Sequence, residues 1–256
     1  MCATCGCDGH SHTGHDHNHL NTDHSHPNGD HSHHKTIVDV GKDILSENNL
    51  LAERNRGYFE AKDILAINLV SSPGSGKTSL LERTLKDMKD TLHFEVIEGD
   101  QQTTNDADRI HATGTKVVQI NTGKGCHLDA HMILHAIQGM KPPANTVLFI
   151  ENVGNLVCPA MFDLGEKERV VIMSVTEGED KPLKYPDMFH TSTLCIINKT
   201  DLLPYVPFNL LKAKENAAQV NPRLEILEVS CTTGEGLERW YDWLQAKAIA
   251  LPSLLQ

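Results

Sequence analysis

Residues 71–78, SSPGSGKT, decide the fold of this chain. They directly follow the apolar run Ile64–Val70 and open a stretch with helical periodicity. The octet matches the GxxxxGK[ST] pattern, except that Ser71 stands in place of the first glycine. Gly74 and Gly76 allow backbone N–H groups to turn inward around phosphate oxygens, and the start of the helix adds a favourable partial charge. A strand, this loop and a helix, in that order, predict a phosphate-binding loop.

The polar residues of this loop have distinct expected roles. We expect the Lys77 ammonium to reach the β- and γ-phosphates of a nucleotide, and the Thr78 hydroxyl to ligate Mg²⁺. Lys77 is therefore also a predicted catalytic residue. The predicted nucleotide-binding residues at this end of the site are Gly74, Ser75, Gly76, Lys77, Thr78 and Ser79.

Short apolar runs alternate with helical stretches along the rest of the chain. This alternation predicts an α/β fold of the P-loop NTPase type, a mostly parallel sheet with helices on both faces. The expected strands are 64–70, 94–97, 116–120, 146–150, 169–175, 193–197 and 224–229. The expected helices are 77–88, 106–112, 128–137, 207–219 and 236–248.

The composition divides the chain into three parts. Residues 1–34 hold ten of the 16 His and three of the seven Cys, with no Lys or Arg. They carry too little apolar surface to offset the chain entropy of folding, so we expect a metal-binding, Cys/His-rich tail that is mostly disordered without a ligand. Residues 35–63 show a broken apolar stripe, which predicts one or two leading helices. Residues 64–256 form the expected P-loop GTPase domain.

A second motif, NKTD at residues 198–201, follows the apolar run Leu194–Ile197. It matches the NKxD pattern of GTPases. The Asp201 carboxylate can accept from the N1–H and the N2 amino group of guanine, a donor pair that adenine lacks. Together with the phosphate-binding loop, the motif predicts GTP as the substrate and places Asn198, Lys199 and Asp201 at the base.

Two acidic residues end predicted strands near the loop. Asp100 closes residues 96–100, and Glu151 closes residues 147–151 and begins an ExxG pattern where many GTPases have DxxG. Either acid can hold Mg²⁺ directly or through water, and we favour Asp100 as the closer one. We expect Glu151 to sense the γ-phosphate, and we count both acids as catalytic. Because no Gln occupies an obvious water-orienting position, we expect slow intrinsic hydrolysis.

Two groups of residues are predicted metal ligands. Cys2, Cys5 and Cys7 are closely spaced thiols that can wrap one soft ion, and an N-terminal amine can complete an N/S donor set suited to Ni²⁺. Cys126-His127 and Cys158 follow expected strand ends, at the edge of the sheet where ligands bind in open α/β folds. Two thiolates and one imidazole offer three ligands to Zn²⁺ or Ni²⁺ and leave one position open.

The remaining His and Cys residues are weaker candidates. His127, His131 and His135 recur every four residues on an expected helix, and for this row a solvated polar face is favoured over a second metal site. The His tract can buffer Ni²⁺ or Zn²⁺ through several weak sites. Cys195 lies inside an expected strand, where core packing is its expected role, whereas Cys231 suits either role. The turn at 230–232 either supports the base or is a plain turn.

Charge and hydropathy argue against several other classes. A net charge of −11 disfavours non-specific nucleic-acid binding, which needs a basic face. No apolar run approaches the roughly 18 residues that a membrane helix requires. The N-terminus lacks the basic and apolar regions of a secretory signal, and the Cys spacing does not suggest a disulfide framework. We therefore expect a cytoplasmic protein whose thiols are available for metal.

Taken together, the motifs resemble the HypB-type GTPases, the nickel-insertion proteins of [NiFe] hydrogenase maturation. The resemblance extends from about residue 36 to the C-terminus, and Ser71 is ordinary in that family. Cys2, Cys5 and Cys7 also match a high-affinity nickel motif of some members. The shared blocks are SSPGSGKT (71–78), EGDQQT (98–103), NTGKGCHLDA (121–130), ENVGNLVCPA (151–160), EGEDKPLKYP (177–186) and NKTDLLP (198–204).

The resemblance implies a GTPase metallochaperone that couples GTP hydrolysis to nickel delivery into the hydrogenase large subunit. It implies a HypA-type nickel chaperone as partner, a SlyD-like metallochaperone as a further candidate, and a GTP-promoted homodimer. It also implies that Cys126, His127 and Cys158 carry the metal site of the domain, near the dimer interface.

Three alternative interpretations stay open. A UreG-type urease maturation GTPase shares the loop class, but the Cys126-His127 and Cys158 arrangement and the N-terminal Cys motif disfavour it. The protein can instead be chiefly a nickel store with a vestigial GTPase. It can also be an adenine-nucleotide enzyme with metal-binding segments, which competition between GTP and ATP would decide.

Overall fold

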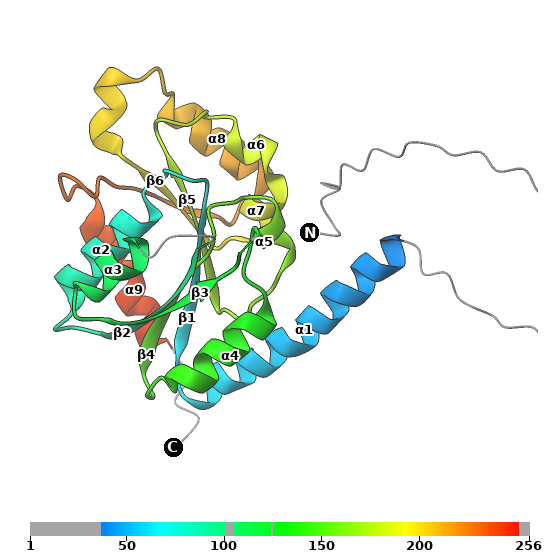
Figure 1. Ribbon diagram of the computed structural model, residues 1–256. Coiled ribbons are helices and arrows are strands. Elements are labelled where there is room, and N and C mark those ends of the chain that lie inside the picture. The colour runs from blue at the N-terminus through cyan, green and yellow to red at the C-terminus, as the bar shows by residue number, and fades with distance from the viewer. Residues whose placement is uncertain (1–36, 101–104, 124, 251–256) are drawn as a thin grey trace, which may run out of the picture.

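One seven-stranded parallel sheet lies at the centre of the described residues, which are 37–100, 105–123 and 125–250 of this computed structural model (Figure 1). The strands are β1 Leu65–Ser71, β2 His93–Asp100, β3 Lys116–Asn121, β4 Thr146–Glu151, β5 Glu168–Ser174, β6 Leu194–Asn198 and β7 Glu225–Glu228. Their order in the sheet is β3-β2-β4-β1-β5-β6-β7. The central strand β1 therefore carries the phosphate-binding loop at its carboxyl end. The predicted tail, residues 1–34 with Cys2, Cys5 and Cys7, lies outside the described residues.

All seven expected strands are present, so the predicted α/β architecture is confirmed. Every residue of β1, β4 and β5 is buried. A strand covered on both faces reads as a continuous apolar run, and such runs are the pattern that predicted these strands.

The helices cover both faces of the sheet (Figure 1). They are α1 Ile37–Ala61, α2 Lys77–Met88, α3 Asn105–His111, α4 Ala130–Met140, α5 Cys158–Met161, α6 Lys181–Lys184, α7 Pro186–Thr191, α8 Leu210–Val220 and α9 Leu237–Ile249, with a 3-10 helix η1 at Thr200–Tyr205. One face packs against α2, α3 and α9. The other face packs against α1 and α4 on one half and against α7 and α8 on the other.

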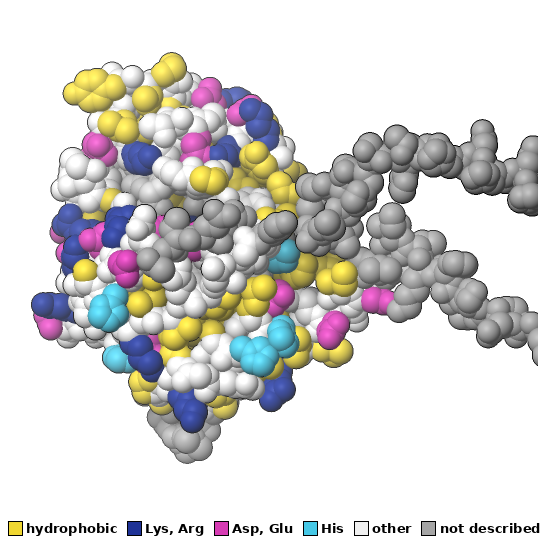
Figure 2. All heavy atoms as spheres, viewed as in Figure 1, with side chains coloured by type: hydrophobic (Ala, Val, Ile, Leu, Met, Phe, Trp, Pro, Cys, Tyr) yellow, Lys and Arg dark blue, Asp and Glu magenta, His cyan; other side chains and the backbone are white. Residues whose placement is uncertain are grey.

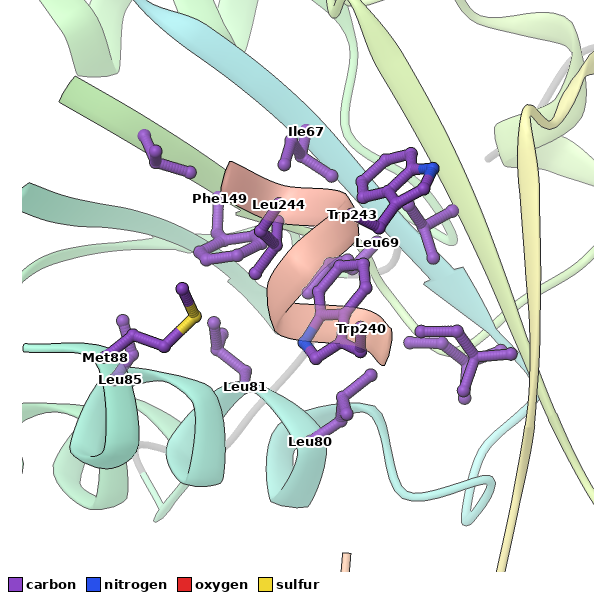
Figure 3. Packing of buried hydrophobic residues seen from close by; sticks show 14 of the residues in the cluster. Ile67, Leu69, Leu80, Leu81, Leu85, Met88, Phe149, Trp240, Trp243 and Leu244 are labelled. Carbon is purple, nitrogen blue, oxygen red and sulfur yellow. The ribbon is translucent and has the colours of Figure 1, made fainter. Parts of the chain in front are cut away.

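Successive residues of β1 contribute to opposite sides of the core. Ile67 and Leu69 pack with Trp240 of α9, against α2 (Figure 3). Ala66 and Val70 face the helices on the other side. Burying an aliphatic side chain of this kind contributes about 1.5–3 kcal/mol, so the central strand is held firmly from both faces.

The leading segment is one continuous helix, and buried asparagines explain why its apolar stripe looks broken. Asn48 Nδ2 donates to Asp163 O at 2.8 Å, and Asn48 Oδ1 accepts from Ala130 N at 2.9 Å. Asn55 Nδ2 donates to Ala130 O at 2.9 Å and to Leu164 O at 3.1 Å. These bonds fasten α1 to the start of α4 and to the loop after α5, where apolar packing alone would be weak.

The surface of the described residues is mixed in character. On the face shown in Figure 2, acidic and basic side chains are interspersed. Among the helices that the structure describes, none combines the length and apolar character that crossing a membrane would require.

Candidate functional site

The phosphate-binding loop joins β1 to α2 at the carboxyl edge of the sheet. Gly74 and Gly76 have φ angles of 78° and 93°, in the left-handed region that favours glycine. A Cβ atom on Gly76 would lie 2.4 Å from Asn198 Nδ2, so this close approach also requires glycine. The loop and the NKxD motif, far apart in sequence, therefore meet at one edge.

A cavity of about 500 Å³ opens beside the loop. The predicted residues that line it are Gly74, Gly76, Lys77, Thr78, Ser79, Asp100 and Lys199. Ser75, Glu151 and Asn198 are buried and are not among the lining residues. Inward-facing loop backbone, two lysines and the first residues of a helix suit an anionic ligand such as a nucleotide phosphate.

Glu151 is the acid that contacts the loop directly. Glu151 Oε1 accepts from Lys77 Nζ at 2.7 Å and from Thr78 Oγ1 at 2.6 Å. The sequence favours Asp100 as the closer acid to a magnesium ion. Glu151 is the hydrogen-bond partner of Thr78, Asp100 lines the cavity at the end of β2, and the preference for Asp100 as the magnesium acid stays a prediction.

Three carboxylates gather beside the loop, and one of them, Glu98, is not among the residues predicted from the sequence. Glu98 is buried at the cavity wall. Burial, followed by the charges of Glu151 and Asp100, raises the pKa of Glu98 to about 8. Glu98 Oε2 and Glu151 Oε2 have no hydrogen-bond partner among the described residues. Buried carboxylate oxygens beside the Thr78 hydroxyl form a hard oxygen donor set, so these residues fit Mg²⁺.

The base side is held by the NKxD motif and the turn after β7. Asn198 Nδ2 donates to Ser75 O at 3.0 Å, which ties the motif to the phosphate-binding loop. Ser230 Oγ donates to Asp201 Oδ1 at 2.6 Å and orients the carboxylate expected to recognise guanine. The turn at 230–232 therefore contacts the base motif through a side chain.

Cys126, His127 and Cys158 converge, and their donor atoms all lie within 4.8 Å of one another. Cys126 Sγ is 3.6 Å from His127 Nδ1, and the His127 ring stacks on Phe162 with centroids 4.0 Å apart. Burial lowers the pKa of His127, which favours the neutral imidazole that a metal requires. Two thiols and one imidazole at this spacing can hold Zn²⁺ or Ni²⁺.

Residues 151–158 join the nucleotide side to this cluster. The segment begins at the acid that contacts the phosphate-binding loop and ends at a cluster cysteine. Between them, Asn152 Oδ1 accepts from Leu128 N at 3.1 Å, and Asn155 Nδ2 donates to Cys126 O at 3.3 Å. The Cys126-His127 loop is therefore tied to the segment that ends at Cys158.

The other His and Cys candidates lie apart from the cluster. His131 and His135 are exposed on α4, with their Nε2 atoms 3.0 Å apart. Cys195 is fully buried in β6, and burial raises its pKa to about 12. Burial also raises the pKa of the half-buried Cys231 to about 11. Cys195 lies in a hydrophobic core cluster and Cys231 packs against another, so core packing suits both cysteines.

Sequence patterns do not identify several residues of the site. Asp106 and Arg109 of α3 line the cavity along with Glu98, and Asn152 bridges to the cluster loop. Glu98 could have been found from the sequence, because it lies two residues before Asp100 at the end of the same predicted strand. Arg109 had no such signal, because it lies in no motif and its partner Ser79 is distant in sequence. Asn152 lies within the ExxG pattern, but that pattern does not reveal its bond to Leu128 N.

Comparison with known proteins places these features in one family. The nucleotide-binding domain of the CobW/HypB/UreG family matches residues 65–228. The hydrogenase maturation factor HypB of Rhizobium leguminosarum bv. viciae is 62% identical over 212 residues, which cover 83% of this chain and 71% of that protein. HypB of Escherichia coli K12 is 57% identical over 216 residues, which cover 84% of this chain and 74% of that protein.

Solved structures give the same result. A crystal structure of HypB from Archaeoglobus fulgidus superimposes with a TM-score of 0.75 at 42% identity, covering 79% of this chain and 99% of that one. A crystal structure of HypB from Helicobacter pylori in complex with nickel has a TM-score of 0.75 at 39% identity, covering 79% of this chain and 95% of that one.

Proposed function

This chain belongs to the HypB group of the CobW/HypB/UreG family, and on that premise we propose that it is a GTPase metallochaperone of [NiFe] hydrogenase maturation. It binds nickel and couples GTP hydrolysis to insertion of nickel into the hydrogenase large subunit. A guanine-nucleotide pocket and a Cys/His cluster joined by one short segment support this assignment.

The nucleotide step uses the loop and base residues described above. Lys77 binds the β- and γ-phosphates, and Asp201 selects guanine. Thr78, with Asp100 or Glu151, would hold Mg²⁺, which supplies positive charge beside the phosphates. We expect slow intrinsic hydrolysis, because among the described residues no glutamine lines the nucleotide cavity.

The coupling step starts from the contact that carries this proposal, the Glu151 carboxylate shared by Lys77 and Thr78. An arriving γ-phosphate competes with Glu151 for the Lys77 ammonium, so residues 151–158 shift. The shift moves Cys158 and reaches the Cys126 loop through side-chain amides. The geometry of the cluster, and hence its nickel affinity, then depends on the nucleotide state.

The test measures Ni²⁺ affinity of the full chain carrying Ala at Cys2, Cys5 and Cys7, loaded with GDP and with a non-hydrolysable GTP analogue. We expect a difference of about fivefold or more, the lower end of typical coupling energies. Asn152→Ala should reduce that difference, because it cuts the bond to Leu128 N. Asn221→Ala is the matched control, since Asn221 bonds carbonyls around residues 189–192, away from both sites. Equal nickel affinity in the two nucleotide states would refute the coupling.

The proposal extends to the rest of the nickel route. Cys2, Cys5 and Cys7 form a second nickel site, and Zn²⁺ is an alternative occupant of the Cys126–His127–Cys158 cluster. The partners are a HypA-type nickel chaperone, the hydrogenase large subunit and, as a further candidate, a SlyD-like metallochaperone. GTP promotes a homodimer with the cluster near its interface.

A further inference from the structure

The segment after β5, EGEDKPLKYP at residues 177–186, has no task in the nucleotide and metal chemistry described so far. Two of its charged side chains contact the phosphate-binding loop. Ser75 Oγ donates to Glu177 Oε1 at 2.6 Å, and Lys181 Nζ donates to Ser72 Oγ at 2.5 Å. Ser72 lines the nucleotide cavity, whereas Glu177 and Lys181 are not among the lining residues. The pair therefore touches the loop from behind.

The pair is itself rigidly held. Glu177 and Lys181 form an ion pair whose side chains are 15% and 13% exposed, so water screens it little. Glu177 Oε1 also accepts from Ser174 N at 3.0 Å, which anchors the carboxylate to the end of β5. Asn216 of α8 donates to Glu179 O at 2.9 Å and fixes the turn between the two charged residues. The back of the loop thus rests on the sheet and on α8.

The opposite side of the loop is held by the base motif. Lys199 Nζ donates to Gly74 O at 2.7 Å, and Asn198 Nδ2 donates to Ser75 O at 3.0 Å. Those two bonds are donated to backbone carbonyls and come from the guanine side of the site. Glu177 and Lys181 instead bond the hydroxyls of Ser75 and Ser72, so they can fix the conformation of residues 72–75 through its side chains. A loop that already has its ligand-bound conformation loses less binding free energy to ordering when the ligand binds.

We propose that Glu177 and Lys181 are positioning residues that hold the loop in its phosphate-binding conformation and so set the affinity for the β- and γ-phosphates, not for the guanine base. The proposal rests on the proposed nucleotide binding at this site. Because the two residues act as one unit, removing either should lose most of what removing both would lose.

The experiment compares GDP with guanosine on the full chain, using displacement of a fluorescent GDP analogue in the presence of Mg²⁺. In Glu177→Ala, Lys181→Ala and the double variant, GDP affinity should fall about tenfold to a hundredfold, the range for losing hydrogen bonds to charged groups. Guanosine affinity should stay within about twofold of wild type, because guanosine has no phosphate for the loop to hold. A loss that were only structural would weaken both ligands alike.

Matched variants keep the test decisive. The Asp180–Lys184 pair has the same spacing on the same segment, at 2.7 Å, but its side chains are 48% and 63% exposed. Asp180→Ala and Lys184→Ala should leave GDP affinity unchanged. If the alanine variants fold poorly, Glu177→Leu and Lys181→Met keep much of the side-chain volume without the polar groups and should show the same selective loss. Lys181→Arg, which keeps the charge and the donor, should retain wild-type GDP affinity.

The outcomes separate the two proposals. Failure of the wild-type chain to bind GDP would remove the proposed function itself. Normal GDP binding by the wild type, with GDP affinity unchanged in the Glu177 and Lys181 variants or with equal losses of GDP and guanosine, would overturn the positioning role alone.

Discussion

The nucleotide pocket and the Cys126–His127–Cys158 cluster lie at the same edge of the sheet but are stabilised differently. The phosphate-binding loop is held by side chains from three other segments: Glu151, Glu177 with Lys181, and Asn198 with Lys199. The cluster forms where the Cys126-His127 loop meets Cys158, and a ring stack and amide bonds from residues 151–158 are among its contacts. The pocket is therefore held by side chains from several segments, whereas the cluster geometry depends in part on the position of residues 151–158.

The largest expected effect tests the pocket. Lys77→Ala should lower GTP hydrolysis by about a hundredfold to a thousandfold, because it removes a cation aimed at the transferred phosphate. It should also destabilise the protein by about 3 kcal/mol, since Glu151, which is 1% exposed, is left as an unpaired buried charge. Single-turnover hydrolysis and urea unfolding measure the two losses.

A second substitution separates the two consequences of losing Lys77. In Lys77→Ala combined with Glu151→Gln, stability should return towards wild type while hydrolysis stays lost. If hydrogenase maturation in cells survives Lys77→Ala at ordinary nickel supply, storage and not nucleotide-driven delivery is the main role of the protein.

The next effect tests the cluster. Cys158→Ala should weaken Ni²⁺ binding at the domain site by at least about a hundredfold, since even changes in partners around a metal site cost up to that much. GDP affinity should not change, because the pocket is held by other contacts. A chelator competition with the full chain carrying Ala at Cys2, Cys5 and Cys7 measures the site without the N-terminal thiols.

Cys195→Ala is the control for the cluster. Cys195 is also buried, but it packs in the hydrophobic core within β6 and is not part of the cluster. It should leave the nickel affinity unchanged. A loss of nickel binding in this control as large as that in Cys158→Ala would mean that general destabilisation, not ligand loss, caused both.

Some features of the fold and of the site can be predicted from the sequence, and others cannot. The strands are predictable because burial on both faces makes them continuous apolar runs. The helices α5, α6 and α7 are not, because each spans six residues or fewer and no periodicity can develop. The glycines and Lys77 of the loop are predictable because the chemistry requires those residue types at fixed spacing.

Contacts across long sequence separations are the part that spacing does not reveal. Glu177 contacts a serine 102 positions away, and Lys181 contacts one 109 positions away. Asn152 bonds a backbone amide 24 positions away. The order of the strands in the sheet brings these partners together, and no local pattern encodes them. The direct contact between Glu151 and Thr78 is another such pair, 73 positions apart, whereas the preference for Asp100 as the magnesium acid stays a prediction.

Two substitutions at the guanine-binding end of the site should have smaller effects on nucleotide affinity. Asp201→Asn should lower GTP affinity about tenfold to a hundredfold by removing a charged acceptor, with ATP affinity unchanged. Ser230→Ala should cost less, about fivefold, because the carboxylate remains but loses the hydroxyl that orients it at 2.6 Å. Competition binding with GTP and ATP measures both. A larger loss in Ser230→Ala than in Asp201→Asn would mean that the turn, not the carboxylate, recognises the base.

The smallest expected effect concerns Glu98, whose burial in the pocket should lower the folding stability of the nucleotide-free protein. Burial first, and then the charges of Glu151 and Asp100, raise the pKa of Glu98 from its ordinary 4.5 to about 8. Below pH 4.5 this group is neutral in both the folded and the unfolded chain, and it carries no penalty. As pH rises from 4.5 to about 8, the unfolded chain releases the proton while the folded chain retains it, so stability falls. Above about 8 the penalty is constant.

Glu98→Gln cannot ionise and should therefore be more stable than wild type, by an amount that grows across that pH window. We expect a gain on the order of 1 kcal/mol at pH 8, or about 2–4 °C in Tm, and none at pH 4. The exposed carboxylate variant Asp90→Asn should show no such trend. Thermal melts of nucleotide-free protein between pH 4 and 9 measure it, and parallel curves for wild type and Glu98→Gln would contradict the assignment. Mg²⁺ with GDP should narrow the gap between wild type and Glu98→Gln, because a cation beside the three carboxylates removes the charge repulsion that the variant removes by substitution.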